Sequence, residues 1–265
     1  MNDHNSSFIF FALNVAFTVF SFTSCHPLNR RDPLLPADRI DLPLRIEHIK
    51  GGVYSVEDGN FWKTNSVFWI GDDDVYFFDA TWQPASANLL LFEVMSLTTL
   101  DFRGLILTSA HQSRAGGAQS FVLDRIPVLI QQNAVSDFEK NWLAANDQLS
   151  ESFLSWRRTP LPDLKAAIDK KLTLADGKIE VIYPGEGWSA DNLVVLFRDE
   201  RLLYGGSLVA YPPLFTATVD RRKVLQALKI VEALPFDRVI SGHGKVIQDR
   251  SIFKKLKQYY TKQTL

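Results

Sequence analysis

The amino-acid sequence predicts an α/β fold with four layers, an αββα sandwich in which helices cover the outer faces of two packed β-sheets. Apolar segments of strand length gather in two groups, one in each half of the chain. Segments with the helical spacing of apolar residues flank both groups. Of the 265 residues, 46% are hydrophobic, so the chain can bury one sizeable core without needing a second domain.

The first half of the chain contains the first group of expected strands. Strands are expected at 51–57, 66–70, 75–79, 104–108 and 127–131. Helices are expected at 85–97, in a short segment after Gly117 and at 134–145, and a loop at 150–162 follows them. The run 72–74 is three aspartates, which we interpret as a solvated hairpin turn. A cation-binding loop would need further acidic residues at regular spacing.

The second half repeats this logic. Strands are expected near 172–174, 178–183, 193–198, 202–205 and 237–241. A helix is expected at 220–234, and a closing helix begins at about 250. The sequence therefore predicts a second sheet with its own helices.

The amino-terminal segment is typical of a bacterial export signal. Phe8 to Phe22 form an apolar run of 15 positions interrupted by Asn14, which is shorter than the roughly 20 residues that span a bilayer as a helix. Thr23 and Ser24 then precede the only cysteine, Cys25, as in a lipoprotein cleavage site. The first seven residues lack Lys and Arg, so a signal cleaved without lipidation and a plain apolar anchor stay open as alternatives.

These features divide the chain into a signal segment at 1–25, a tether at 26–45 and a folded domain at 46–265. Lipidation of Cys25 would place the domain in the bacterial cell envelope. Since His26 follows Cys25 where an inner-membrane retention signal would carry Asp, analogy favours the periplasmic side of the outer membrane. Otherwise the chain would be secreted to the periplasm, and the lipid anchor is its only expected link to a membrane.

Net charge argues against nucleic acid as a partner. The chain carries 29 Lys and Arg against 30 Asp and Glu, which gives a net charge of −1. We therefore expect no basic field that would attract nucleic acid.

Glycine-containing turns follow several expected strands and carry most of the candidate functional residues. The strand 105–107 leads into Thr108-Ser109-Ala110-His111-Gln112-Ser113-Arg114. Comparable strand ends occur at 75–82 with Asp79, at 183–192 with Trp188, at 204–209 with Ser207 and at 240–244 with His243.

In this order, the segments resemble the landmarks of the metallo-β-lactamase superfamily, closest to the branch of the zinc β-lactamases. The resemblance covers residues 46–260 and implies the αββα fold. It also implies that Ser109, His111 and Trp188 occupy the ligand positions of the first metal. Ser113, Ser207 and His243 occupy those of the second. Each implied site therefore keeps a single histidine, and serine and tryptophan are poor zinc ligands.

His111 and His243 leave three interpretations open. They are hydrogen-bonded histidines that contact Ser109, Ser113, Ser207 or Asp79, residual ligands of a single metal, or contacts for an organic ligand. Of the other histidines, His4 lies in the signal, His26 in the tether and His48 near the start of the domain, so too few imidazoles remain to rebuild a metal site elsewhere.

Two further patterns allow other functions. The serines beside two histidines and Asp79 allow a serine nucleophile, although the chain lacks the Gly-X-Ser-X-Gly turn. Aromatic and Arg side chains could line a binding groove, and the candidates are Arg114, Trp142, Trp156, Trp188 and Tyr211.

The sequence therefore predicts an envelope protein of metallo-β-lactamase fold that lacks most zinc ligands, holds no cofactor and acts as a binding or scaffold module. Its partner would be a small molecule or an envelope protein. The alternative is a hydrolase with a weak single-metal or metal-free site. A second alternative is a structural envelope protein without a ligand.

Overall fold

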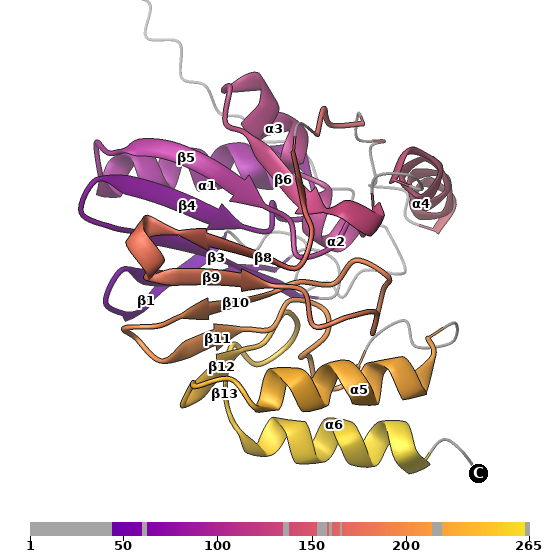
Figure 1. Ribbon diagram of the computed structural model, residues 1–265. Helices are drawn as coiled ribbons and strands as arrows, with labels where there is room; N and C mark the ends of the chain where they lie inside the picture. Colours follow the sequence, from indigo (N-terminus) through magenta and orange to yellow (C-terminus); the bar gives the residue numbers. More distant parts are fainter. Residues whose placement is uncertain are drawn as a thin grey trace, which may run out of the picture.

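The computed structural model describes residues 44–59, 63–134, 138–152, 158, 161–164, 166–213 and 219–262. Cys25, most of the expected tether and Trp156 lie outside the described residues. Within the described part, two β-sheets pack face to face, with helices on both outer faces (Figure 1). This arrangement confirms the predicted αββα architecture.

The first sheet contains seven strands in sequence order. The first four strands are antiparallel neighbours, and β4 to β7 are parallel. Its strands are β1 (Arg45–Lys50), β2 (Val53–Asp58), β3 (Thr64–Ile70), β4 (Asp74–Phe78), β5 (Asp101–Ile106), β6 (Val128–Gln131) and β7 (Ala166–Ile168). The aspartate run forms the expected turn between β3 and β4, where Asp72 pairs with Lys178 at 2.8 Å.

The second sheet has six strands in the order β13-β12-β11-β10-β9-β8. Only β11 and β12 are parallel; the other neighbours are antiparallel. Its strands are β8 (Lys171–Leu174), β9 (Ile179–Ile182), β10 (Val194–Phe197), β11 (Leu202–Tyr204), β12 (Arg238–Ile240) and β13 (Ile247–Asp249).

Six α-helices and two short 3-10 turns complete the described part: α1 (Pro84–Leu97), α2 (Gln112–Ala115), α3 (Ala118–Leu123), η2 (Gln132–Ala134), α4 (Phe138–Ser152), η3 (Ala175–Gly177), α5 (Arg221–Glu232) and α6 (Ser251–Lys262). The expected helix at 134–145 is instead η2 followed, after residues 135–137, by α4, which extends into the expected loop at 150–162. No helix among the described residues is long and apolar enough to cross a membrane.

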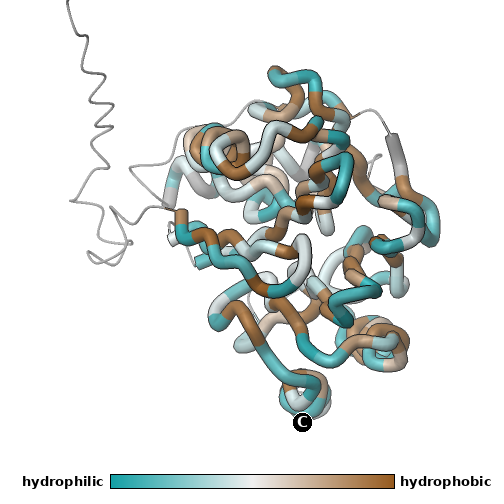
Figure 2. Tube along the Cα trace, turned by 90° about the vertical axis from the view of Figure 1, so that its left-hand side faces the viewer, coloured by the Kyte–Doolittle hydropathy of each residue, from teal (hydrophilic) through white to brown (hydrophobic). Residues whose placement is uncertain are grey.

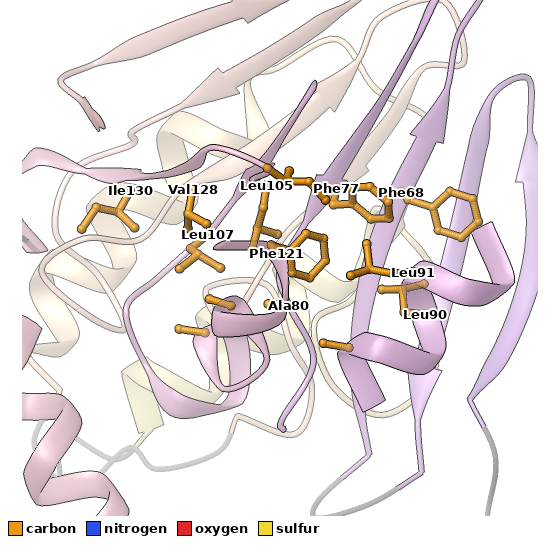
Figure 3. Packing of buried hydrophobic residues seen from close by; sticks show 14 of the residues in the cluster. Phe68, Phe77, Ala80, Leu90, Leu91, Leu105, Leu107, Phe121, Val128 and Ile130 are labelled. Carbon is orange, nitrogen blue, oxygen red and sulfur yellow. The ribbon is translucent and has the colours of Figure 1, made fainter. Parts of the chain in front are cut away.

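The core is divided among three layers of contact. Between the first sheet and its helices, Phe77 packs edge to face against Phe121 of α3, with ring centroids 5.1 Å apart (Figure 3). Between the two sheets, Phe78 of β4 meets Phe197 of β10 at 5.4 Å. Burying one such side chain contributes about 1.5–3 kcal/mol, so these layers account for the stacking of the sheets.

The second outer layer consists of α5 and α6. Both helices bury residues at the spacing of one helical face: Val224, Ala227, Leu228 and Val231 from α5, and Ile252, Phe253, Leu256 and Tyr260 from α6. Asp220 caps α5 by accepting a hydrogen bond from the backbone N–H of Arg222. Figure 2 shows hydrophobic and hydrophilic residues side by side along α6, whose end carries the C label.

Candidate functional site

The residues identified in the sequence gather where strands of the two sheets end. Asp79 follows β4 and the 107–111 loop follows β5, and because these strands are parallel, both segments lie at one edge of the first sheet. Ser207 and His243 likewise follow the parallel strands β11 and β12. The backbone N–H of Leu193 donates to Thr108 O at 2.8 Å and joins the two edges. We call this region the sheet-end site.

Arg114 occupies the centre of the sheet-end site. Its side chain has 0% exposure, so it does not line a groove as the sequence suggested. Nε donates to Ser207 Oγ at 2.9 Å, and Nη2 donates to Gly242 O at 2.8 Å. Nη1 donates to Asn65 O at 2.8 Å and to the Tyr204 hydroxyl at 3.1 Å. One guanidinium therefore connects α2 with the ends of three strands from both sheets.

Asp79 supplies the counter-charge to Arg114. Its backbone is left-handed, with φ of 67°, and its carboxylate lies 3.6 Å from Arg114 Nη1. The Thr108 backbone N–H and hydroxyl donate to the two oxygens of Asp79 at 2.6 and 2.7 Å, and the Tyr204 hydroxyl donates at 2.5 Å. Burial raises the pKa of Asp79, whereas Arg114 and these hydrogen bonds lower it.

The contacts of Asp79 bear on the serine-nucleophile interpretation. That mechanism needs a carboxylate that orients a histidine. Within the described residues, Asp79 contacts Thr108, Tyr204 and Arg114, and no histidine is among its partners. The geometry therefore does not assemble a Ser-His-Asp arrangement around Asp79.

His111 forms the second part of the sheet-end site. Its Nδ1 accepts from the backbone N–H of Ser113 at 3.2 Å and caps α2, and it lies 2.9 Å from Ser113 Oγ. Because a backbone N–H can only donate, Nδ1 is an acceptor and the neutral ring carries its proton on Nε2. The Trp188 indole packs edge to face against this ring, with centroids 5.1 Å apart.

The environment of His111 predicts a pH-dependent stability. Burial and the Arg114 cation lower the pKa of His111 from 6.5 to about 4. In the unfolded chain His111 takes up a proton near pH 6.5, whereas in the folded chain it does so only near pH 4. Its contribution to the free energy of unfolding is therefore complete above pH 6.5 and is lost as the pH falls to 4. We expect a loss on the order of 3 kcal/mol over this window, measured by urea unfolding. His111→Asn keeps a capping side chain without the titration and should flatten this dependence. An unchanged slope in that variant would contradict the assignment.

The loop after β9 adds residues that sequence reasoning did not place in the site. Asp191 accepts from the backbone N–H of Ala110 at 2.6 Å, and burial raises the pKa of Asp191. Asn192 accepts from the backbone N–H of Ser189 at 2.7 Å and donates to Gly185 O at 3.0 Å. These amide and carboxylate contacts fix the loop that carries Trp188. The sequence Asp191-Asn192, which follows Gly185 and Gly187, could have indicated a turn held by side-chain hydrogen bonds.

His243 follows Gly242, whose carbonyl accepts a hydrogen bond from Arg114. It is 3% exposed and forms a β-bridge with Thr64 of β3. Beside it, Asn65 donates from Nδ2 to Ser241 O at 2.8 Å. A Cβ at Gly242 would lie 1.9 Å from Gly206 O and 2.5 Å from Arg114 Nη2, so only glycine fits there. Asn65 was missed because it lies in the polar start of β3, before the expected strand at 66–70, and belongs to no motif.

The remaining sequence candidates have separate positions. Ser109 is buried, and its Oγ accepts from the His111 backbone N–H at 3.3 Å. Trp142 was a candidate for lining a groove, but it is 2% exposed and packs against Phe138 in the core of the first sheet. Trp142 and Phe138 lie one helical turn apart on the inner face of α4, so their spacing is that of core residues and not of a groove. Tyr211 is 40% exposed.

The donor set of the sheet-end site does not fit zinc. A structural or catalytic zinc ion needs at least three nitrogen, thiolate or carboxylate ligands close together. Among the described residues, no group of three or more His, Cys, Asp or Glu side chains could hold a metal ion. At the ligand positions that the family resemblance implies, Ser109, Ser113 and Ser207 offer only hydroxyl oxygens and Trp188 offers an indole.

No protein-family model matches the chain. A curated relative, the type 2 metallo-β-lactamase of Elizabethkingia meningoseptica, is 22% identical over 171 residues. The match covers 63% of this chain and 62% of the relative, so it spans less than two thirds of the relative's length.

Solved structures extend the similarity over most of the chain. FIM-1 from Pseudomonas aeruginosa, a metallo-β-lactamase in its mono-zinc form, has a TM-score of 0.72 at 16% identity and covers 85% of this chain and 98% of its own. TMB-1 has a TM-score of 0.67 at 21% identity, with coverages of 84% and 100%. A metallo-β-lactamase from Pontibacter korlensis reaches 0.66 at 19% identity, with 82% and 99%. The chain therefore has the metallo-β-lactamase fold, as the resemblance noted in the sequence implied.

Proposed function

We propose that this protein is a binding or scaffold module of metallo-β-lactamase fold that neither holds zinc nor hydrolyses β-lactams. The observation that carries the proposal is the state of His111. Its Nδ1 lone pair is occupied by the Ser113 backbone N–H, and Nε2 carries the proton, so in this tautomer neither nitrogen offers a lone pair to a metal. Binding a metal through Nε2 would require the other tautomer, which gives up the hydrogen bond from the Ser113 backbone N–H.

The composition of the sheet-end site supports the same conclusion. A zinc hydrolase lowers the pKa of a metal-bound water towards 7 and polarises the scissile carbonyl, and both effects require a firmly held ion. Serine hydroxyls at positions 109, 113 and 207 are weak donors for zinc. Ser207 already accepts a hydrogen bond from Arg114, a fixed cation that disfavours a further positive charge nearby.

The rival proposal is a hydrolase with a weak single-metal or metal-free site. It predicts turnover of a chromogenic β-lactam that depends on His111 or His243. We expect turnover no faster than in buffer, with or without added zinc or a chelator, because no ion activates a water. Chelator-sensitive turnover that disappears in His111→Ala would favour the rival and overturn the proposal.

For the location, the apolar run before Cys25 supports a lipid-anchored protein of the bacterial cell envelope, with a small molecule or an envelope protein as its partner. Three acyl chains bury many methylenes at roughly 0.8 kcal/mol each, which is enough for stable anchoring. Growth in labelled palmitate should mark the wild type and leave Cys25→Ser unlabelled. A wild type without label would leave ordinary secretion as the explanation.

A further inference from the structure

The helices of the second outer layer form a basic face. Helices α5 and α6 together carry eight Lys or Arg residues and one Glu, although the whole chain has 29 cationic and 30 acidic residues. Cationic and acidic residues are therefore unevenly distributed over the surface, and cations exceed acidic residues on these two helices although the whole chain has a net charge of −1. We call the outer surface of these two helices the α5–α6 face.

Several cations of this face are exposed and make no ion pair within the described residues: Lys229, Lys254, Lys255 and Lys262. Two others are neutralised locally, since Lys223 binds Glu186 and Lys257 binds Glu232 at 2.7 Å. Between the cations, Ile230 is 50% exposed. The unpaired charges repel one another, so an anionic partner would relieve a standing electrostatic cost.

We propose that the α5–α6 face lies against an anionic lipid surface. The two helices lie side by side along the outside of the sandwich, where their cations can approach one plane (Figure 1). Anionic headgroups attract Lys and Arg within about one Debye length, roughly 8 Å at physiological salt. Ile230 fits an interface where an apolar side chain can enter the acyl boundary. A nucleic acid offers phosphates but no apolar layer that Ile230 could enter, so this side chain favours a lipid surface.

The amino-terminal segment allows this contact. With the lipid anchor at Cys25, 18 residues separate the anchor from Leu44, where the described domain begins. An extended stretch of that length reaches about 60 Å. A domain of this size has a radius of gyration of about 17 Å, so the connection can bring either outer face to the membrane. This proposal does not depend on whether the sheet-end site binds zinc.

The opposite outer face is the rival docking surface. On α1, Leu89, Phe92, Met95 and Leu97 are 38%, 63%, 55% and 52% exposed, and Glu93 is the only charged residue of that helix. Docking through α1 would be driven by apolar burial, so it would need no anionic lipid and would resist salt. Docking through the α5–α6 face would instead require anionic lipid and would be weakened by salt.

The test reconstitutes the full chain into vesicles of phosphatidylcholine alone or with phosphatidylglycerol, and follows the labelling of each lysine by an amine-reactive reagent with mass spectrometry. We expect Lys229, Lys254, Lys255 and Lys262 to react about fivefold more slowly in the anionic vesicles, and high salt should abolish this protection. Lys170, exposed in the turn after β7, should react equally in both.

Pairs of exposed cations without an ion pair supply matched variants. Lys254→Glu with Lys255→Glu should remove the protection of Lys229, whereas Arg125→Glu with Lys170→Glu should leave it unchanged; circular dichroism verifies the fold of both. Equal labelling of the α5–α6 face in neutral and anionic vesicles overturns the proposal. So does protection that persists in high salt, or protection by a DNA duplex in the absence of any effect of the vesicles.

Discussion

Replacing Arg114 by Met should destabilise the domain by about 3–5 kcal/mol, because the buried Asp79 loses its counter-charge and two carbonyls each lose one of their donors. The two carbonyls belong to Asn65 and Gly242, which lie on different sheets. Arg114 thus joins the sheet ends together with Tyr204 and Asn65, whose side chains also hydrogen-bond from one sheet to the other. Urea unfolding at pH 7, followed by circular dichroism, measures the effect.

The matched control is Arg103, whose Nε binds Asp74 while 55% of its side chain is exposed. Exposed pairs of this kind contribute about 0–1 kcal/mol, so Arg103→Met should change stability little. Arg114→Lys retains the charge without the planar fork of donors and should be intermediate, which keeps the comparison measurable if the Met variant does not fold. If Arg114→Met costs no more than Arg103→Met, the network does not join the sheets.

Restoring the ligand set of the family should create a zinc site. The variant Ser109→His, Ser113→Asp, Trp188→His and Ser207→Cys surrounds His111 and His243 with nitrogen, carboxylate and thiolate donors. It should bind about two zinc ions per chain, since zinc in a well-formed structural site contributes on the order of 10 kcal/mol. Dialysis followed by elemental analysis measures the uptake.

Adding His111→Ala and His243→Ala to this variant removes one donor from each implied site and should abolish the uptake. Turnover of β-lactams is a separate matter, because groups around the ligands orient them and their loss costs about 10–100-fold in affinity or activity. A variant that folds by circular dichroism but binds no zinc would show that the four positions do not converge on the histidines.

The architecture could be predicted from the sequence because the spacing of apolar residues identifies most strands and helices, and their order along the chain groups them into two sheets. The strands from β2 to β6 and the helices α1, α5 and α6 lie close to their expected ranges. Strand β1 was missed because its residues, Arg45 to Lys50, are mostly exposed at a sheet edge and lack an apolar period. Four strands have three residues each; β11 and β12 were expected because they are mostly apolar, whereas β7 and β13 were missed, and β13 (Ile-Gln-Asp) has a single apolar residue.

The site could be predicted only in outline. The motifs placed His111, Ser113, Ser207 and His243 near one another, since each follows a strand end. The burial of Arg114 could not be inferred, because it depends on Asn65 and Tyr204, which lie inside strands far away in sequence. Polar contacts between residues far apart in the chain produce no recognisable spacing of residues in the sequence. The distribution of charge on the α5–α6 face likewise appears only when two helices separated along the chain lie side by side.

The most direct test of the central claim is the zinc content of the purified wild-type protein. After dialysis against buffer with micromolar zinc and then without it, elemental analysis should find less than about 0.1 zinc per chain, because His111 is committed to α2 and the other implied positions hold weak donors. His111→Ala should give the same low value. Stoichiometric zinc that survives dialysis in the wild type and is lost in His111→Ala would contradict the account.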